Sequence, residues 1–429
     1  MGSNDLLEKS EKITVFGAGL SGQAVVDYLI GKGVKVFVTE KNEINSGTRS
    51  KFQERGVKFE EGGHSRRVLN SDLIVLSPGV PPDHERVKEA RNLGIPVIGE
   101  LELAYRLSPT NRIIGVTGTN GKSTTVNLIK EILEYAGVSS MACGNIGTPF
   151  ISLIPELTPF DAAVVEVSSY QLETTERFKP RVAVLTNLEQ DHLKRHESFE
   201  KYREVKLRIF NNQGEEDYAV IKEGLNLDIP NKKPTPIEFY PREHRGMELP
   251  PHQEENVGAA LAAVNCLLEG TEFDSPPLEP VNRGLELPHR LEFVGTINGI
   301  EFIDDSKATN PAATRAAINS IEKPIRLLLG GKGKRSDYDN LFGAIGPSSV
   351  RATYLFGSAK EKLAKTMGKL ETLNFGTYPS LKRAVRQAFA DAIRGEVVLL
   401  SPGCSSFDSF NNFEERGERF KEIVNELEN

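Results

Sequence analysis

Short apolar runs alternate with amphipathic segments along most of the chain. The runs are short enough for buried strands, and the segments between them repeat their apolar positions with a helical period. This alternation is typical of βαβ units, in which helices cover the faces of a parallel sheet. The expected strands are Lys12–Phe16, Val34–Thr39, Asp72–Ser77, Arg112–Thr117, Asp161–Val167, Arg181–Thr186, Ile300–Ile303, Ile325–Leu329, Thr353–Phe356 and Val397–Leu400.

Helical patterns fall between these strands. The expected helices are Gln23–Ile30, Ser123–Ala136, Ser198–Asn211 and Val257–Leu268. A further helix should begin at Pro311, because Asn310 is a good N-cap and proline suits the first helical position. The segment Asn211–Pro251 is rich in Pro, Lys and Glu, so we expect an irregular surface segment there.

These elements group into three blocks, and 429 residues are enough for two or three domains. We predict an α/β protein with a Rossmann-like domain over residues 1–108, a central P-loop ATPase-like domain with a parallel sheet over 109–291, and a second Rossmann-like domain over 292–429. The chain is 38% apolar and 26% charged, values ordinary for a soluble protein. Its formal net charge of −7 argues against nonspecific binding to nucleic acid or a membrane surface.

The cysteines and the N-terminal segment indicate the cellular compartment of the protein. Cys143, Cys266 and Cys404 lie far apart and form no C-x-x-C pair, so we expect neither a disulfide framework nor a zinc site. The N-terminus is polar, and no run approaches the about 18 apolar residues of a membrane span. We expect a monomer in a reducing, cytoplasmic compartment, with no nucleic-acid or membrane partner.

The strongest local signal lies between an expected strand and an expected helix. It is the run Gly118-Thr119-Asn120-Gly121-Lys122-Ser123-Thr124. This is the context of a P-loop, in which backbone N–H groups and a helix N-terminus hold phosphate oxygens. Lys122 can contact the β- and γ-phosphates of ATP, and Ser123 can ligate Mg²⁺. The loop has the short G-x-x-G-K-[ST] form, because Val116 stands where the longer pattern has a glycine. The alternative is a glycine-rich turn with an exposed lysine.

A second glycine-rich turn follows the first expected strand. It is Gly17-Ala18-Gly19-Leu20-Ser21-Gly22, which matches G-x-G-x-x-G. Glu40 ends the next strand, where an acidic residue would bind a ribose. Taken alone the motif favours NAD, but a nucleotide sugar also places phosphate at a helix N-terminus, and a hydride-transfer enzyme does not need a separate ATP loop. A tight packing turn without a ligand is the other alternative.

Polar residues stand at the ends of two buried strands and on one helix face. Glu166 and His192 fall at the sheet edge expected beside the P-loop, where Mg²⁺ could bind. The alternatives are a salt-bridged glutamate and a structural histidine. Lys206 shares a helix face with Phe199 and Tyr202, so its ammonium must reach an acid or a phosphate, or be chemically modified.

Together these residues resemble the Mur ligase superfamily, which also contains folylpolyglutamate synthase. The resemblance spans nearly the whole chain in collinear order. The motifs are GTNGKST (118–124), GNIG (144–147), EVSSYQLE (166–173), TNLEQDHLKRH (186–196), YREVKLRIF (202–210), PHR (288–290), DDSKATN (304–310), LGGKGK (329–334) and SPGCSSFDSFNNFEERG (401–417).

Carried over position by position, the resemblance implies roles for single residues. It implies that residues 118–124 hold the ATP phosphates and that Asn256, Arg290 and Asp305 contact other parts of ATP. The implied metal ligands are Ser123, Glu166, His192 and Lys206, the last as a carbamate. The implied catalytic residues are Lys122, His192, Lys206 and Lys307. The implied substrate-binding residues are Leu20, Ser21, Glu40, Lys41, Asn145, Gln171, Thr309, Lys334, Ser406 and Phe413. The first four of these would line a uridine pocket, and the last three an amino-acid site.

The reaction that the resemblance implies is ATP-dependent addition of D-glutamate to UDP-N-acetylmuramoyl-L-alanine through an acyl phosphate, in cytoplasmic peptidoglycan precursor synthesis. The implied cofactors are ATP and two Mg²⁺ ions, with Mn²⁺ as a possible substitute. The alternatives are folylpolyglutamate synthase, which lacks the N-terminal G-x-G-x-x-G block, and a nicotinamide-dependent oxidoreductase or nucleotide sensor.

Four positions depart from the family pattern. Lys194 replaces an acid, Glu197 stands at a common glycine position, one of two asparagines near Asn256 is absent, and Lys332 adds a charge to a glycine loop. From the added basic groups we expect an amino-acid selectivity broader than D-glutamate, with lysine as a candidate.

Overall fold

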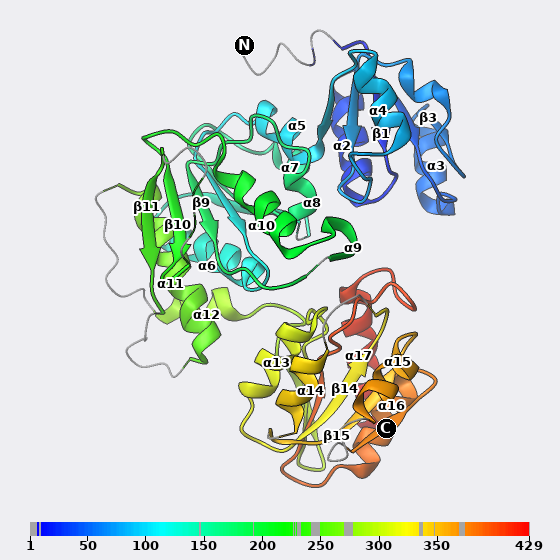
Figure 1. Ribbon diagram of the computed structural model, residues 1–429, viewed down its shortest axis with the longest axis vertical. Helices are drawn as coiled ribbons and strands as arrows, with labels where there is room; N and C mark the ends of the chain where they lie inside the picture. Colours follow the sequence, from blue (N-terminus) through cyan, green and yellow to red (C-terminus); the bar gives the residue numbers. More distant parts are fainter. Residues whose placement is uncertain are drawn as a thin grey trace. The chain divides into compact units, whose positions relative to one another are not determined.

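The computed structural model describes residues 7, 10–145, 147–191, 193–225, 227, 229, 233–241, 249–269, 278–333, 338–346, 348–368 and 374–428. The chain forms two compact units. The first is made of Met1–Leu188 and Arg203–Gly284, and the second of Glu189–Tyr202 and Leu285–Asn429. Two sheets lie in the first unit and one in the second (Figure 1). Within the described part of the chain, no helix has both the length and the apolar character needed to cross a membrane.

The first sheet is parallel throughout, in the order β3-β2-β1-β4-β5. Its strands are β1 (Lys12–Phe16), β2 (Lys35–Thr39), β3 (Lys58–Glu60), β4 (Leu73–Leu76) and β5 (Val97–Gly99). Its helices are α2 (Leu20–Gly31), α3 (Ser46–Glu54), the 3₁₀ turn η1 (Arg66–Leu69), α4 (Glu85–Asn92) and α5 (Glu100–Leu107). Successive residues of β1 face different cores: Val15 belongs to the cluster that includes α2, and Phe16 to the cluster that includes α4. Because the strand order reverses at β1, a ligand site is expected at its carboxyl end.

The central sheet is also parallel, in the order β11-β10-β9-β6-β8-β7. Its strands are β6 (Ile113–Thr117), β7 (Ser140–Gly144), β8 (Ala162–Glu166), β9 (Val182–Leu185), β10 (Tyr218–Lys222) and β11 (Thr235–Phe239). The helices around it are α6 (Lys122–Tyr135), α7 (Phe150–Leu153), α8 (Ser169–Leu172), α10 (Phe199–Leu207) with the 3₁₀ turn η2 (Arg208–Phe210), α11 (Pro251–Leu267) and α12 (Leu278–Leu285). Since β6 is buried between β9 and β8, the loop that follows it emerges in the middle of the sheet edge.

The prediction of an irregular segment over Asn211–Pro251 is wrong, because β10 and β11 lie within it. Val220 of β10 stands opposite Val184 of β9, and the middle of β10 is buried. The charged and proline-containing flanks conceal this short apolar run in the sequence. β11 contains Pro236 and an exposed Glu238, which an edge strand tolerates because only one of its sides must form ladder hydrogen bonds.

The sheet of the second unit has the order β12-β13-β17-β14-β15-β16 and is parallel except for the β12–β13 hairpin. Its strands are β12 (Glu292–Ile297), β13 (Ile300–Asp304), β14 (Ile325–Gly330), β15 (Val350–Phe356), β16 (Phe375–Thr377) and β17 (Val397–Leu400). The helices of this unit are α9 (Leu193–His196), α13 (Pro311–Asn319), α14 (Asp339–Ile345), α15 (Lys360–Met367), α16 (Leu381–Asp391) and α17 (Phe413–Glu428).

The predicted α/β class is confirmed, and each predicted strand is present with ends shifted by a few residues at most. Asn310 caps α13 as predicted: its Oδ1 accepts the N–H of Ala313 at 2.9 Å, and Pro311 occupies the first turn. The hydrophobic pattern does not predict β3, β5, β7, β12 and β16, because these strands are short or partly exposed.

Candidate active site

The P-loop joins β6 to α6 in the first unit. Gly118 and Gly121 have φ angles of 146° and 82°, which glycine adopts without strain. A Cβ atom on Gly121 would lie 2.3 Å from Oδ1 of Asn256, so no larger residue fits there. Gly121 also precedes α6, whose first turn holds no acidic residue. The backbone N–H groups and partial positive charge of a helix end suit a phosphate.

Two lysine side chains meet the same carbonyl group of the loop. Lys122 Nζ donates to the carbonyl oxygens of Gly118 and Thr119, at 2.9 and 2.8 Å. Lys206, on α10, is 2% exposed; its Nζ donates to the Gly118 carbonyl at 2.8 Å and lies 3.4 Å from Oγ1 of Thr117. The core-facing position expected for Lys206 thus brings its amine to the phosphate loop.

Glu166, at the end of β8, has each carboxylate oxygen bound by a side chain. Ser123 Oγ donates to Oε2 at 2.5 Å, and Asn145 Nδ2 donates to Oε1 at 2.8 Å. The glutamate is buried. A carboxylate beside a hydroxyl supplies the oxygen donors that Mg²⁺ prefers, so this pair fits a magnesium ion. His192, the other strand-end candidate, lies outside the described residues.

Residues after β9 fix the shape of the loop, although no motif assigned them a role. Oδ1 of Asn187 accepts the N–H of Asn120 at 2.8 Å, and Nδ2 of Asn187 donates to the Asn120 carbonyl at 3.1 Å. Thr186 Oγ1 donates to the same carbonyl at 2.6 Å. Their position in the sequence, directly after a buried strand, could have predicted a place beside the P-loop, because parallel strands bring their carboxyl ends together.

Two further predicted residues are buried in structural contacts of the first unit. Asn256, on α11, has its Oδ1 3.4 Å from Oγ1 of Thr125 on the P-loop helix. Gln171 forms the capping box of α8, where its Oε1 accepts the N–H and the hydroxyl of Ser168 at 2.9 and 2.8 Å. Gln171 is not among the described residues that line the cavity at the first sheet.

That cavity has a volume of about 910 Å³ and opens at the carboxyl end of the first sheet. Five of the predicted substrate-binding residues line it: Leu20, Ser21, Glu40, Lys41 and Asn145. Glu40 braces the glycine turn, because its Oε2 accepts the N–H of Ala18 at 2.8 Å and its Oε1 accepts the N–H of Asn42 at 3.1 Å. Asn145 lines the cavity and also donates a hydrogen bond to Glu166, the carboxylate that fits Mg²⁺. The cavity therefore extends to a direct neighbour of Glu166. Other residues that were not predicted also line the cavity, among them His64, His84 and Arg86.

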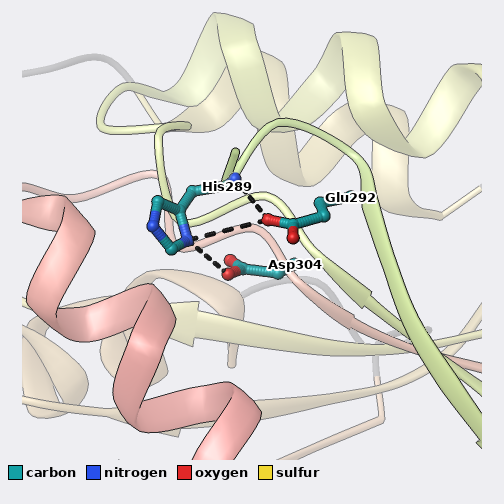
Figure 2. Close-up of side chains that lie close together, drawn as sticks. All are labelled: His289, Glu292 and Asp304. Atoms are coloured by element: carbon teal, nitrogen blue, oxygen red, sulfur yellow. Dashed lines mark hydrogen bonds and ion pairs between the residues drawn. The ribbon is translucent and has the colours of Figure 1, made fainter. Parts of the chain in front are cut away.

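In the second unit, a histidine–carboxylate cluster precedes the predicted ATP residue Asp305 (Figure 2). Nδ1 of His289 lies 2.7 Å from Oδ2 of Asp304 and 3.9 Å from Oε2 of Glu292. This is metal-like spacing, but the main-chain N–H of His289 also donates to Oε2 of Glu292 at 2.7 Å, and Lys421 Nζ lies 2.8 Å from Oε1 of Glu292. Hydrogen bonds and ion pairs therefore account for the cluster.

Predicted residues near this cluster form two pairs, Asp305 with Arg290 and Lys307 with Phe413. Burial raises the pKa of Asp305 to about 7, although the hydrogen bond from Ser401 at 2.7 Å and the charge of Arg290 both lower it. Nζ of Lys307 lies 4.8 Å from the ring centre of Phe413, a cation–π contact. The Thr309 N–H donates to the Lys307 carbonyl at 2.8 Å. Lys334 lies outside the described residues.

Arg416, on α17, was not among the candidates and is completely buried. Its Nε donates to the Ser306 hydroxyl at 3.0 Å, its Nη2 to the Ser306 carbonyl at 2.7 Å, and its Nη1 to the Cys404 carbonyl at 3.1 Å. Burial lowers the pKa of Arg416 to about 10, so it stays charged at neutral pH. Arg416 thereby ties the loops after β13 and β17 to α17. The second of these loops contains the predicted residue Ser406, which is buried.

The fold and the loop define a P-loop α/β protein whose first sheet carries a large cavity at its carboxyl end. Three family models match in chain order: the MurD N-terminal domain over residues 12–86, the Mur ligase middle domain over 116–240, and the Mur ligase glutamate ligase domain over 289–404. The chain belongs to the Mur ligase family.

Curated relatives match the chain almost from end to end. The UDP-N-acetylmuramoylalanine–D-glutamate ligase of Koribacter versatilis is 36% identical over 453 residues, which cover 98% of each chain. The ligase of the same name from Syntrophus aciditrophicus is 38% identical over 458 residues, covering 96% of this chain and 97% of the relative.

Solved structures agree on the fold. MurF ligase from Thermotoga maritima in complex with ADP has a TM-score of 0.60 at 16% identity and covers 99% of both chains. UDP-N-acetylmuramate-alanine ligase MurC from the same organism has a TM-score of 0.59 at 17% identity and covers 97% of this chain and 99% of its own. A folylpolyglutamate synthase from Yersinia pestis covers only 76% of this chain, with a TM-score of 0.55. These likenesses concern the fold, and membership of the Mur ligase family rests on the family models and the curated relatives.

Proposed function

We propose that this chain joins D-glutamate to UDP-N-acetylmuramoyl-L-alanine while ATP is converted to ADP and phosphate. Relatives that are 36% and 38% identical over nearly the whole chain are named for this activity. One structural observation supports it most. The cavity is bordered by Asn145, Asn145 bonds Glu166, and Glu166 bonds Ser123 of the P-loop. A nucleotide-linked substrate in the cavity would therefore present its carboxylate beside ATP.

In this proposal each block of the chain binds one substrate. Residues 1–108 bind the nucleotide sugar, residues 109–291 bind ATP, and residues 292–429 bind the amino acid. The diphosphate of the sugar nucleotide lies at the N-terminus of α2, where backbone N–H groups favour an anion. Leu20 and Glu40 face its nucleoside. Arg290 and Asp305 contact ATP.

The residues around Glu166 fit Mg²⁺ and define where it would act. Ser123 and Glu166 would hold one ion, and His192 and a carbamate on Lys206 would complete the metal site, as in the family that the motifs resemble. When bound, Mg²⁺ neutralises charge on the phosphate oxygens. Lys206 supports this placement because its Nζ already lies on the P-loop carbonyl of Gly118.

The proposed chemistry makes a poor electrophile reactive. A carboxylate resists attack by an amine because of its charge and resonance. An oxygen of the L-alanyl carboxylate attacks the γ-phosphorus, the bond to ADP breaks, and an acyl phosphate forms. The amine of D-glutamate then attacks the acyl carbon and loses a proton, and phosphate leaves with the electrons of the C–O bond. Lys122 positions the γ-phosphoryl group and stabilises the charge that develops on it.

The experiment is an assay of phosphate release and product mass with ATP, UDP-N-acetylmuramoyl-L-alanine and an amino acid. We expect turnover only when all three are present. Lys122→Ala should lower kcat by a factor of about 10²–10³. Lys130→Ala is the matched control on the same helix, because Lys130 pairs with Glu131 and Glu134, and it should retain activity. Wild-type protein that forms no amide, or Lys122→Ala that forms it undiminished, contradicts the proposal.

The amino acid is tested in the same assay with D-Glu, L-Glu, D-Lys and L-Lys. We propose that selectivity extends beyond D-glutamate, because Lys332 adds a charge close to the loop of Ser406. The Lys332 N–H donates to the Ser405 carbonyl at 2.7 Å. Strict use of D-glutamate would contradict the broader selectivity while leaving the ligase activity intact.

A further inference from the structure

His64 forms part of the cavity wall. It follows β3, and its ring centre lies 4.8 Å from that of Phe16 and 5.0 Å from that of His84, whose ring is nearly perpendicular to it. Phe16 is buried at the end of β1. The His64 imidazole therefore rests on a fixed surface, and its nitrogen atoms have defined surroundings.

One set of hydrogen bonds determines which nitrogen of His64 holds a proton. Oγ1 of Thr39 lies 2.8 Å from Nδ1 of His64 and 2.9 Å from Oε1 of Glu60. A hydroxyl has one hydrogen, and an ionised carboxylate can only accept. Burial raises the pKa of Glu60, but hydrogen bonds from Ser65 and Thr39 lower it overall, which keeps the carboxylate ionised. The Thr39 hydrogen therefore points to Glu60, and Nδ1–H of His64 donates to Thr39.

The other ring nitrogen is then a hydrogen-bond acceptor. Burial and the neighbouring His84 lower the pKa of His64, and the opposing charges of Glu40 and Glu60 do not reverse this shift. Lys41 lowers it further, so the ring is neutral near pH 7. With the proton on Nδ1, Nε2 presents a lone pair. Among the described residues, none forms a hydrogen bond to this atom.

We infer that Nε2 of His64 accepts a hydrogen bond from the nucleoside of the bound nucleotide sugar and so contributes to the selection of uridine. This inference rests on the proposed function. Along the carboxyl edge of the first sheet, the glycine turn follows β1, Glu40 follows β2, and His64 follows β3. The diphosphate needs donors and belongs at the glycine turn, while the reacting carboxylate belongs beside Asn145. The edge beyond β2 is left for the nucleoside.

Uridine has two kinds of donor that can satisfy a lone pair on His64. These are the imide N–H of uracil and the hydroxyl groups of ribose. Cytosine has an unprotonated nitrogen where uracil has its imide N–H, so two lone pairs would face each other. A 2′-deoxyribose lacks one hydroxyl donor. A buried acceptor left without its donor loses binding energy, which is how such a residue discriminates between ligands.

Two substitutions distinguish the roles of the two ring nitrogen atoms of His64. His64→Asn places an amide nitrogen near the Nδ1 position, so the contact with Thr39 is kept, but it has no atom at the Nε2 position. His64→Gln reaches the Nε2 position and lacks the other. We expect His64→Asn to weaken UDP binding about tenfold in calorimetry on the full chain, with the KM for ATP unchanged, and His64→Gln to retain most of the affinity.

Analogues then identify the donor. Wild-type protein should bind either CDP or 2′-deoxy-UDP about tenfold more weakly than UDP, and His64→Asn should lose that discrimination. Equal UDP affinity for wild type and His64→Asn, or unchanged discrimination in the variant, overturns the inference. If the variants do not fold, nitrogen NMR of histidine-labelled wild type decides: a proton on Nε2 in the free protein also overturns it. Wild-type protein that binds no UDP at all refutes the proposed function itself.

Discussion

Glu100 should make the first unit less stable at neutral and alkaline pH than at acid pH, and Glu100→Gln should remove this effect. Glu100 begins α5 and is fully buried. Its Oε1 accepts the N–H of Ile151 at 2.9 Å, at the start of α7, and its Oε2 has no hydrogen-bond partner within the described part of the chain. Burial raises the pKa of Glu100 to about 7, because the charged form loses its hydration.

The magnitude follows from the two pKa values of Glu100. The folded protein binds the proton with a pKa of about 7, against 4.5 for an unperturbed glutamate. This difference corresponds to at most roughly 3 kcal/mol. Because the folded state holds the proton more tightly, stability falls as the pH rises from about 4.5 to about 7, and the full cost applies above that range. Glutamine keeps the acceptor for Ile151 and is neutral at every pH.

Denaturant titrations followed by circular dichroism, at about pH 5 and about pH 8.5, test this reasoning. Glu100→Gln should be more stable than wild type by up to roughly 3 kcal/mol at the higher pH and by less than about 1 kcal/mol at the lower pH. Glu102→Gln is the matched control on the same helix. Glu102 accepts the N–H groups of residues 176–178 and pairs with Arg106 at 2.6 Å, so its neutralisation should destabilise at both pH values. A Glu100→Gln protein less stable than wild type at pH 8.5 refutes the argument.

Three further predictions concern other parts of the chain. Arg416→Met should lower stability by about 3 kcal/mol in thermal unfolding, because it leaves buried carbonyls of Ser306 and Cys404 without donors; an unchanged transition contradicts this. Glu197→Gly should raise stability by about 1 kcal/mol, because Glu197 has a φ of 65°, and Glu197→Ala should show no such gain. Removal of CO₂ should lower wild-type activity and bicarbonate should restore it, because the carbamate proposed on Lys206 would form from its amine and CO₂. Lys206→Arg should stay inactive in both conditions, and insensitivity of wild type to CO₂ argues against the carbamate.

Parts of the site that depend on local order along the chain are predictable from the sequence. A glycine-rich loop between a buried strand and a helix predicts a P-loop, and the structure places Lys122 and Ser123 at the start of α6. The helical period places Lys206 on a core-facing stripe, and the structure brings its amine to the Gly118 carbonyl. Both signals survive because neighbours in sequence remain neighbours in a strand–loop–helix unit.

Contacts between distant elements were not predictable in the same way. His64 gains its environment from Phe16, Thr39 and Glu60, which stand on three different strands. The sequence pattern predicts Arg416 to be a charged residue on a surface helix. It is buried only because α17 packs against the loops that contain Ser306 and Cys404. In both cases the partners are chosen by tertiary packing, and the sequence pattern within each element is unremarkable.

In the proposed reaction, a substrate carboxylate near Ser123 and Glu166 takes the γ-phosphoryl group of ATP before the amide bond forms. The most direct measurement uses UDP-N-acetylmuramoyl-L-alanine labelled with oxygen-18 in its carboxylate, incubated with ATP, D-glutamate and the protein. We predict that the phosphate released contains one labelled oxygen, because the carboxylate oxygen leaves with phosphorus. Amide formation with unlabelled phosphate would rule out the acyl phosphate.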